Sequence, residues 1–235
     1  SSAPAQNWGD GARFSTNSRA PTIGDWDGDG LDDLAYQGIC GGSGKAHQCW
    51  RVHSSRGDSF TAPEDWGATP ARQVKSMPVD LDGDGRDDLL FQSECEDESC
   101  WFVQLSDGKS FGEPMRAGRV SSAESRAFRF FDFDGNGTDD VISWATGDDE
   151  SRIEARFGSA TGLSKVVVLA RIDGPIDEVH LERAGGHAPA RASVRLPCGD
   201  DSCVETLFAT SSRSLVDGDH YRSAMLGRRG VPIIT

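Results

Sequence analysis

The feature that most constrains this chain is a nine-residue acidic segment that occurs three times. It reads DWDGDGLDD at 25–33, DLDGDGRDD at 80–88 and DFDGNGTDD at 132–140, so the copies begin 55 and 52 residues apart. Self-similarity at a nearly constant period indicates an array of similar structural units rather than one irregular domain. The fold must therefore place three such segments in equivalent surroundings.

Short apolar runs of the kind that form β-strands flank each acidic segment. An apolar run begins at the last residue of each acidic segment, and the three runs read DLAYQGI, DLLFQSE and DVISWAT. A polar turn then leads to a second run such as CWRVHSS or CWFVQLS. A brief run precedes each copy and another short segment ends each repeat. This pattern predicts four short strands per repeat and no sustained helix.

A fourth repeat is present in altered form. Cys40 and Cys95 each lie fifteen residues after the start of an acidic segment, and counting back fifteen residues from Cys198 gives Arg183. We expect this repeat to keep the scaffold but to bind no cation. Its former carboxylate positions hold Arg183, Gly185, His187 and Arg191.

Small four-stranded sheets cannot bury both faces alone, which favours sheets packed face to face in a radial array. We predict an all-β fold, a β-propeller of about four four-stranded antiparallel blades or a four-blade segment of a larger propeller. One domain would span 1–235, with repeats at approximately 20–74, 75–127, 128–178 and 179–235, and with 1–19 as an outer strand or closure segment.

The six cysteines fall in near-neighbour pairs, namely Cys40 and Cys49, Cys95 and Cys100, and Cys198 and Cys203. Such pairs fit local disulfides across the hairpin of the second and third strands, formed in an oxidising compartment. Zinc is the competing interpretation, but no spacing is C-x-x-C and no histidine is in register. We therefore expect a secreted or extracellular protein, or a periplasmic or cell-surface one.

The charge of the chain is strongly negative. The net charge of −14 argues against nucleic acid as a partner, because phosphates would be repelled. No run approaches the ~18 apolar residues of a membrane span. The three acidic segments hold 14 of the 38 acidic residues, so much of this charge is local.

Alternating carboxylates such as Asp25, Asp27 and Asp29 point apart on an extended strand, and they converge only if the backbone curls. Gly28 and Gly30 permit the curl. A ring of charged oxygens suits a hard cation, and calcium tolerates irregular loop geometry better than magnesium does. The twelfth positions hold no Glu and lie in strand-like runs, which argues against an EF-hand. We predict one Ca²⁺ site in each of the first three repeats.

The spacing D-x-D-G-[DN]-G-x-D-D, followed by an apolar strand, resembles the calcium-binding blades of FG-GAP/VCBS-type propellers. These include integrin α-subunit head domains and integrin-like fungal lectins. The name-giving Phe-Gly and Gly-x-Pro elements are only partly present, as SFGEP at 110–114 and FTAP at 60–63. The resemblance implies, in chain order, the side-chain ligands Asp25, Asp27, Asp29 and Asp33 with the Leu31 carbonyl, Asp80, Asp82, Asp84 and Asp88 with the Arg86 carbonyl, and Asp132, Asp134, Asn136 and Asp140 with the Thr138 carbonyl.

Several other residues have two interpretations. Asp32, Asp87 and Asp139 are expected to face solvent, because successive strand residues alternate sides. Trp50 and Trp101 each follow the second cysteine of a pair, where packing between blades is favoured over a platform for sugar rings.

Two short motifs are weighed against the repeat. GKSFG at 108–112 matches the nucleophile-elbow pattern around Ser110, and RGDS at 56–59 contains a tripeptide that some integrins recognise. Both lie at equivalent turns of the repeat, so repetition explains them without a catalytic or adhesive role.

The sequence favours a secreted, non-enzymatic, calcium-binding module that presents its loops to a glycan or an extracellular protein ligand, by analogy with lectin-like and adhesive relatives. An accessory or catalytic domain of an extracellular hydrolase or lyase is an alternative, using Asp148, Asp149 or Asp217. A structural spacer of a surface protein is another.

Overall fold

The computed structural model describes residues 21–41, 46–69, 76–121, 127–182, 191–198, 201–209 and 215–217. These residues form strands and turns, and they include no helix that could cross a membrane. The all-β class is therefore confirmed for the described part of the chain.

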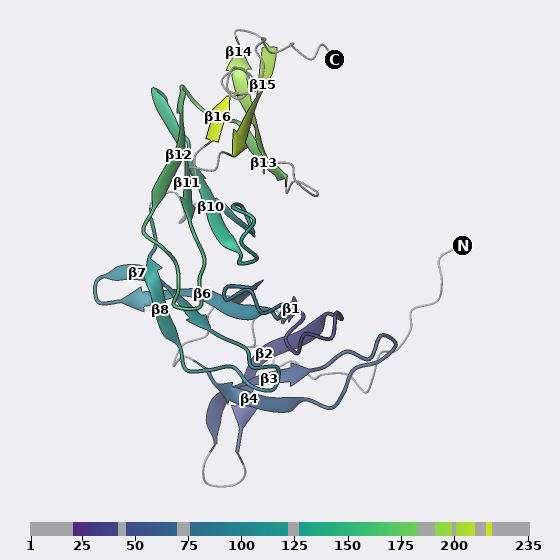
Figure 1. The fold of residues 1–235 in the computed structure, drawn as a ribbon. Helices are drawn as coiled ribbons and strands as arrows, with labels where there is room; N and C mark the ends of the chain where they lie inside the picture. Colours follow the sequence, from purple (N-terminus) through teal and green to yellow (C-terminus); the bar gives the residue numbers. More distant parts are fainter. Residues whose placement is uncertain are drawn as a thin grey trace. The chain divides into compact units, whose positions relative to one another are not determined.

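The strands form four antiparallel sheets, in which each strand pairs with its neighbour in sequence (Figure 1). The first sheet contains β1 (Thr22–Gly24), β2 (Asp33–Cys40), β3 (His47–His53) and β4 (Glu64–Ala68). The second contains β5 (Ser76–Val79), β6 (Asp88–Cys95), β7 (Glu98–Gln104) and β8 (Met115–Arg119). The third contains β9 (Phe128–Phe131), β10 (Asp140–Ala145), β11 (Glu150–Arg156) and β12 (Val167–Asp173). The fourth contains β13 (Glu178–Glu182), β14 (Arg191–Cys198), β15 (Asp201–Ala209) and β16 (Leu215–Asp217).

The chain divides into two compact units, which are described separately. The first comprises Ser1–Arg119 and Ala160–Gly162 and holds β1–β8, and the second comprises Val120–Ser159 and Leu163–Thr235 and holds β9–β16. Strand β13 begins at Glu178, one residue before the predicted start of the fourth repeat, and the repeat boundaries stay a prediction. The single propeller domain stays a prediction, and the expected closure segment at 1–19 lies outside the described residues.

In the first unit, one face of the first sheet packs against the second sheet. Trp50 of β3 is 1% exposed, and its Nε1 donates to Gln104 Oε1 of β7 at 2.8 Å. The centroids of the Trp50 and Phe111 rings are 6.1 Å apart. Trp101 is fully buried. Both side chains are buried, so neither offers a surface to a sugar. Packing between sheets is confirmed for Trp50 and stays a prediction for Trp101. The core consists of Trp26, Ala35, Trp50, Val52, Trp66, Leu89, Phe91 and Phe111.

Gly67 lies at a point where the first and second sheets approach each other closely. The backbone N–H of Phe111 donates to the Trp66 carbonyl at 2.8 Å, and a Cβ on Gly67 would lie 2.9 Å from the Phe111 carbonyl oxygen. Gly67 also has φ +104°, which other residues rarely adopt. A glycine is therefore required where the turn between β7 and β8 reaches β4.

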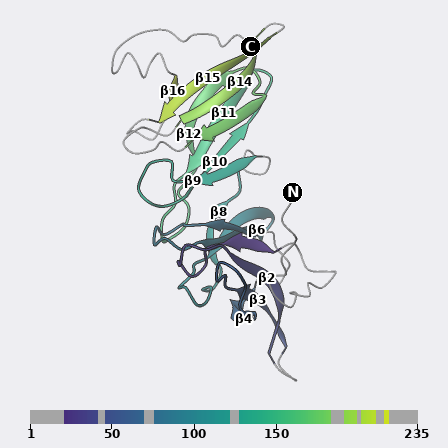
Figure 2. The same ribbon diagram turned by 90° about the vertical axis from the view of Figure 1, so that its right-hand side faces the viewer.

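The second unit repeats this arrangement, with the third and fourth sheets packed together (Figure 2). Ile142 and Ile153 come from the third sheet, and Ala192, Val194 and Leu207 come from the fourth. The rest of this core consists of Phe133, Ala155, Phe157, Leu169, Ile172 and Ile176.

Disulfides cross-link two of the predicted hairpins. Cys40 bonds to Cys49 across β2 and β3, and Cys95 bonds to Cys100 across β6 and β7. Zinc binding by these sulfurs is thereby excluded. Cys203 is also disulfide-bonded. The side chain of Cys198 lies outside the described residues, so the third predicted pairing stays a prediction.

A buried polar side chain at the end of the third strand recurs in three sheets, where it contacts a backbone carbonyl eight residues later. Such a bond satisfies the buried polar group and fixes the turn that follows. The pairs are His53 Nδ1 with the Thr61 carbonyl at 2.8 Å, Gln104 Nε2 with Gly112 at 2.7 Å, and Arg156 Nη1 with Ser164 at 2.9 Å.

Candidate metal centres in the acidic loops

The acidic segments form the connections between the first and second strands of the first three sheets. We call them loop 1 (25–33), loop 2 (80–88) and loop 3 (132–140). The two glycines of each loop have positive φ, between 76° and 91°, which gives the predicted curl. They are Gly28 and Gly30, Gly83 and Gly85, and Gly135 and Gly137.

The first carboxylate of each loop gathers the backbone around it. In loop 1, Asp25 Oδ1 accepts from the N–H groups of Gly28 and Asp29 at 2.9 and 3.1 Å, and Oδ2 accepts from Gly30 at 2.9 Å. Asp80 and Asp132 accept the same three bonds in their loops, at 2.7–3.2 Å. The side chains at the third and fifth positions each accept one further N–H bond.

The last carboxylate of each loop is completely buried and joins the loop to the end of the third strand. Asp33 accepts from the N–H of Trp26 at 3.2 Å and from that of Ser55 at 2.7 Å. Asp88 and Asp140 each accept the two equivalent bonds, at 2.8–3.1 Å. Seven hydrogen bonds therefore recur, position by position, in all three loops.

These bonds bring carboxylate oxygens together in each loop. In each loop, three carboxylates have oxygens within 4.8 Å of one another. Oxygens that share a Ca²⁺ at about 2.3–2.6 Å can be at most about 5 Å apart, so each triplet fits one ion. The triplets are Asp25, Asp27 and Asp29, then Asp80, Asp82 and Asp88, then Asp132, Asp134 and Asp140.

Burial raises the pKa of the last carboxylate of each loop. Burial, with a smaller contribution from the charges of Asp82 and Asp84, raises the pKa of Asp88 to about 7. Burial likewise raises the pKa of Asp140 to about 7 and that of Asp33 to about 6. The ionised loops are thus electrostatically costly on their own, and a bound cation would offset that cost.

We expect calcium to raise the melting temperature more at pH 8 than at pH 5. Without an ion, the folded-state pKa of Asp88 and Asp140 is about 7, above the ordinary value of 3.8. Between these values the folded state holds more protons than the unfolded state, so this contribution to stability is lost as the pH rises through about 7. Calcium favours the ionised form and compensates most at high pH. Thermal melts in calcium and in EDTA at both pH values check this, and equal shifts would contradict it.

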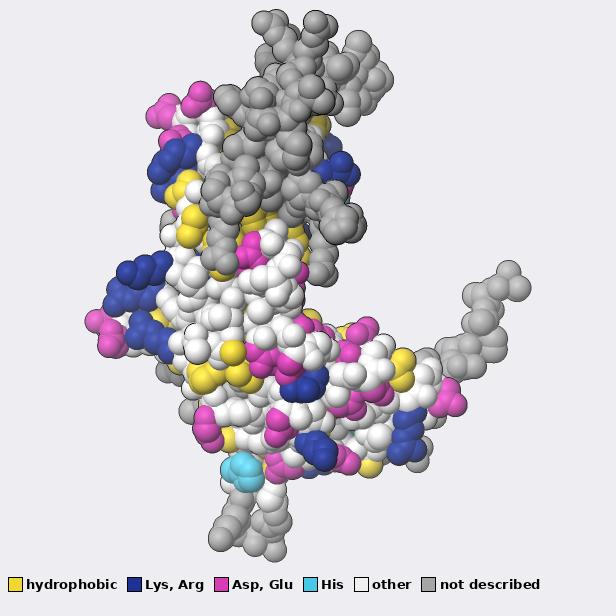
Figure 3. Space-filling view, in the orientation of Figure 1, with side chains coloured by type: hydrophobic (Ala, Val, Ile, Leu, Met, Phe, Trp, Pro, Cys, Tyr) yellow, Lys and Arg dark blue, Asp and Glu magenta, His cyan; other side chains and the backbone are white. Residues whose placement is uncertain are grey.

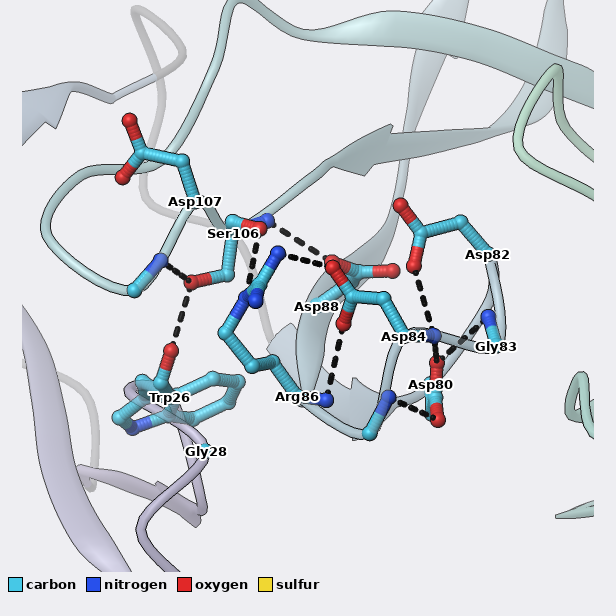
Figure 4. A network of polar contacts seen from close by, with 12 residues as sticks. Trp26, Gly28, Asp80, Asp82, Gly83, Asp84, Arg86, Asp88, Ser106 and Asp107 are labelled. Carbon is cyan, nitrogen blue, oxygen red and sulfur yellow. Dashed lines mark hydrogen bonds and ion pairs between the residues drawn. The ribbon is translucent and has the colours of Figure 1, made fainter.

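The structure brings most of the predicted ligand residues together. Asp33 lies beside the loop 1 triplet, since the charges of Asp27 and Asp29 raise its pKa. Asp84 is not part of the loop 2 triplet, and its carboxylate forms an ion pair with Arg86 (Figure 4). Metal ligation by all of these side chains stays a prediction, as does ligation by the carbonyls of Leu31, Arg86 and Thr138.

One expectation about the loops is wrong. Asp32 is exposed, but Asp87 is half-buried and does not simply face solvent. Its Oδ2 accepts from the Asp25 N–H at 2.8 Å, and its own N–H donates to the Asp25 carbonyl at 2.8 Å. This reciprocal pair joins loop 2 to loop 1, because the packing of the two sheets turns Asp87 toward loop 1. Asp139 is also half-buried.

The altered fourth segment lies mostly outside the described residues, including Arg183, Gly185 and His187. Arg191 is the exception, and it forms an ion pair with Glu182. The absence of a fourth ion therefore stays a prediction.

The residues considered for catalysis lie in turns at the surface, where the structure describes them. Ser110 Oγ donates to Asp107 Oδ2 at 3.2 Å within an exposed turn. Asp148 and Asp149 are exposed between β10 and β11, and the side chain of Asp217 lies outside the described residues. RGDS forms an exposed turn, closed by the bond from the Arg56 N–H to the Ser59 carbonyl at 2.8 Å.

Comparisons with known proteins agree with the repeat. No curated protein matches the chain significantly. A crystal structure of "a putative glycoside hydrolase from Parabacteroides distasonis" is similar at 12% identity and a TM-score of 0.37, covering 85% of this chain and 71% of that one. A likeness at that level carries no argument about fold or activity. Residues 80–143, which run from loop 2 through loop 3 into β10, match the model of the FG-GAP-like repeat. This part of the chain is thus similar to an FG-GAP-like repeat, which supports the resemblance that the acidic segments indicated.

Proposed function

We propose that loops 1, 2 and 3 each bind one Ca²⁺ and that the ions hold the sheets of a propeller together. The observation that carries this is the network of seven hydrogen bonds, which recurs in three loops and in each gathers carboxylate oxygens into a space of ion size. In each loop the ligands would be the side chains at positions one, three, five and nine and the carbonyl at position seven, as the resemblance implies.

A structural role for the ions is supported by what the loops touch. The backbone of Asp25, a candidate ligand, forms two hydrogen bonds with Asp87. Asp87 is the chain neighbour of Asp88, another candidate ligand. Ser106 Oγ donates to the Trp26 carbonyl at 2.6 Å, while the Ser106 N–H is held by Asp88. An ion that fixes either loop would therefore also fix the contact between the first and second sheets.

We further propose that the four sheets are blades of a propeller. In each unit two successive sheets pack against each other, and the packed faces are equivalent in the two units. Acidic side chains are scattered over the visible face of the first unit (Figure 3). Bound cations would offset part of their negative charge. The disulfides and the FG-GAP-like repeat support a non-enzymatic module outside the cytoplasm that binds a glycan or an extracellular protein.

Calorimetric titration with CaCl₂ tests the ion sites, and we expect three ions per chain. Zero would overturn the proposal, and four would overturn the assignment of the fourth segment as ion-free. Screening labelled protein on a glycan array, with and without EDTA, tests the ligand. Binding that EDTA abolishes supports a calcium-dependent lectin, whereas a blank array turns the search to protein ligands.

A further inference from the structure

The three loops differ most in chemistry at their seventh position, which holds Leu31, Arg86 and Thr138. Leu31 is apolar and 38% exposed. The Arg86 guanidinium pairs with Asp84, at the fifth position, and its Nε donates to the Ser106 carbonyl at 3.3 Å (Figure 4). Loop 2 thus carries a cation of its own beside its candidate ligands.

Loop 3 makes the same two links with an uncharged side chain. Thr138 Oγ1 lies 2.6 Å from Asn136 Oδ1, at the fifth position, and 3.2 Å from the Gly158 carbonyl. Gly158 and Ser106 are equivalent, because their N–H groups donate to Asp140 and Asp88. The seventh side chain therefore bridges the fifth side chain to the next turn in both loops.

The charge at the ligand positions follows this pairing. Loop 1 has four carboxylates and a neutral seventh side chain. Loop 2 also has four, but Arg86 neutralises one, and loop 3 has three because Asn136 replaces the fifth. Loops 2 and 3 thus reach the same net charge by different routes, and loop 1 keeps one more negative charge.

Arg86 is also held in place from outside loop 2. A Cβ on Gly28 of loop 1 would lie 2.8 Å from Arg86 Cγ, and one on Gly108 would lie 3.5 Å from Arg86 Cδ. The side chain thus passes between loop 1 and the turn that follows β7. Its charge has little freedom to swing away when loop 2 takes up an ion, so the repulsion between the two cations persists.

We propose that the seventh side chain sets the ion affinity of each loop, and that Arg86 makes loop 2 about tenfold weaker for Ca²⁺ than it would be with leucine. A tenfold change is about the size expected for one positive charge about 6 Å from a divalent ion when water screens both charges. Loop 1 is then the tightest of the three sites. This inference rests on the proposed binding of calcium.

A reciprocal exchange tests it by calorimetric titration of the full chain with CaCl₂ at low salt. Arg86→Leu copies loop 1 into loop 2 and should tighten one binding step about tenfold. Leu31→Arg copies loop 2 into loop 1 and should weaken one step by a similar factor. Asp82→Asn in the Arg86→Leu protein should abolish the tightened step, which assigns it to loop 2. At 0.5 M KCl both changes should shrink, because salt screens the added or removed charge.

Arg119→Leu is the matched control, since Arg119 pairs with Glu98 on the exposed surface of the same unit at 2.9 Å. It should leave every binding step within about twofold. Arg86→Gln provides a second neutral variant of similar length if the leucine variant folds poorly. Binding steps unchanged in Arg86→Leu, Arg86→Gln and Leu31→Arg would overturn the role of the seventh position alone. A wild-type protein that binds no calcium would overturn the proposed function itself.

Discussion

Removing calcium with EDTA is expected to lower the melting temperature by about 15–30 °C. An ion present at 100 times its Kd stabilises a folded protein by about 2.7 kcal/mol per site. For chains of 150–250 residues, each kcal/mol shifts the melting temperature by about 2–4 °C. Three sites acting on loops that contain buried, mutually repelling carboxylates account for the size of the effect.

Differential scanning calorimetry in 2 mM CaCl₂ and in EDTA measures this shift, and adding back excess calcium should reverse it. Magnesium is the control ion. It should restore less, because it requires strict octahedral geometry and gives up its waters reluctantly. A melting temperature that is the same in calcium and in EDTA would show that the loops do not depend on a cation.

The substitution Asp33→Ala is expected to destabilise the protein by about 3–5 kcal/mol in calcium, whereas Asp32→Ala costs no more than about 0.5 kcal/mol. Asp33 is fully buried and accepts bonds from the Trp26 and Ser55 N–H groups, which alanine would leave unpaired. It is also a candidate ion ligand. Asp32 is its exposed neighbour, so the pair compares two carboxylates of one loop.

Urea denaturation of both variants in calcium and in EDTA separates the two contributions. The part that arises from ion binding should disappear in EDTA, and the part that arises from the unpaired N–H groups should remain. Asp33→Asn is informative as well, because it keeps one acceptor oxygen and removes a carboxyl group whose pKa burial raises to about 6. Equal costs for Asp33→Ala and Asp32→Ala would contradict the assignment of the buried carboxylate.

The sheets and the acidic loops could be predicted because their causes are local in sequence. Alternating apolar runs, paired cysteines and the glycines of each loop all act within about ten residues, and their repetition excluded accidental matches. The curl of loop 1 around Asp25, for example, needs only the glycines three and five residues further on.

The contacts between sheets could not be predicted in the same way. The bond from Trp50 to Gln104 joins residues 54 positions apart, and the bond from Asp25 to Asp87 joins residues 62 apart. No local pattern encodes such pairs, because they depend on which faces of two sheets meet. The alternation rule failed at Asp87 for this reason.

Part of what was missed did leave a signal in the aligned repeats. Arg86 stands where the other loops have leucine and threonine, although only its carbonyl was assigned a role. His53, Gln104 and Arg156 likewise share one position without sharing a residue type. Comparing polarity position by position, rather than identity, would have revealed both.

Trp26 gives loop 1 a property that its two counterparts lack. Its indole is fully buried, 5.4 Å from the ring of Phe111, while its carbonyl accepts from Ser106 Oγ. Leu81 and Phe133 occupy the equivalent positions, so loop 1 alone contains a tryptophan fluorophore in its own backbone. Events in that loop therefore have an intrinsic optical reporter, and its filling becomes distinguishable by emission among three chemically similar sites.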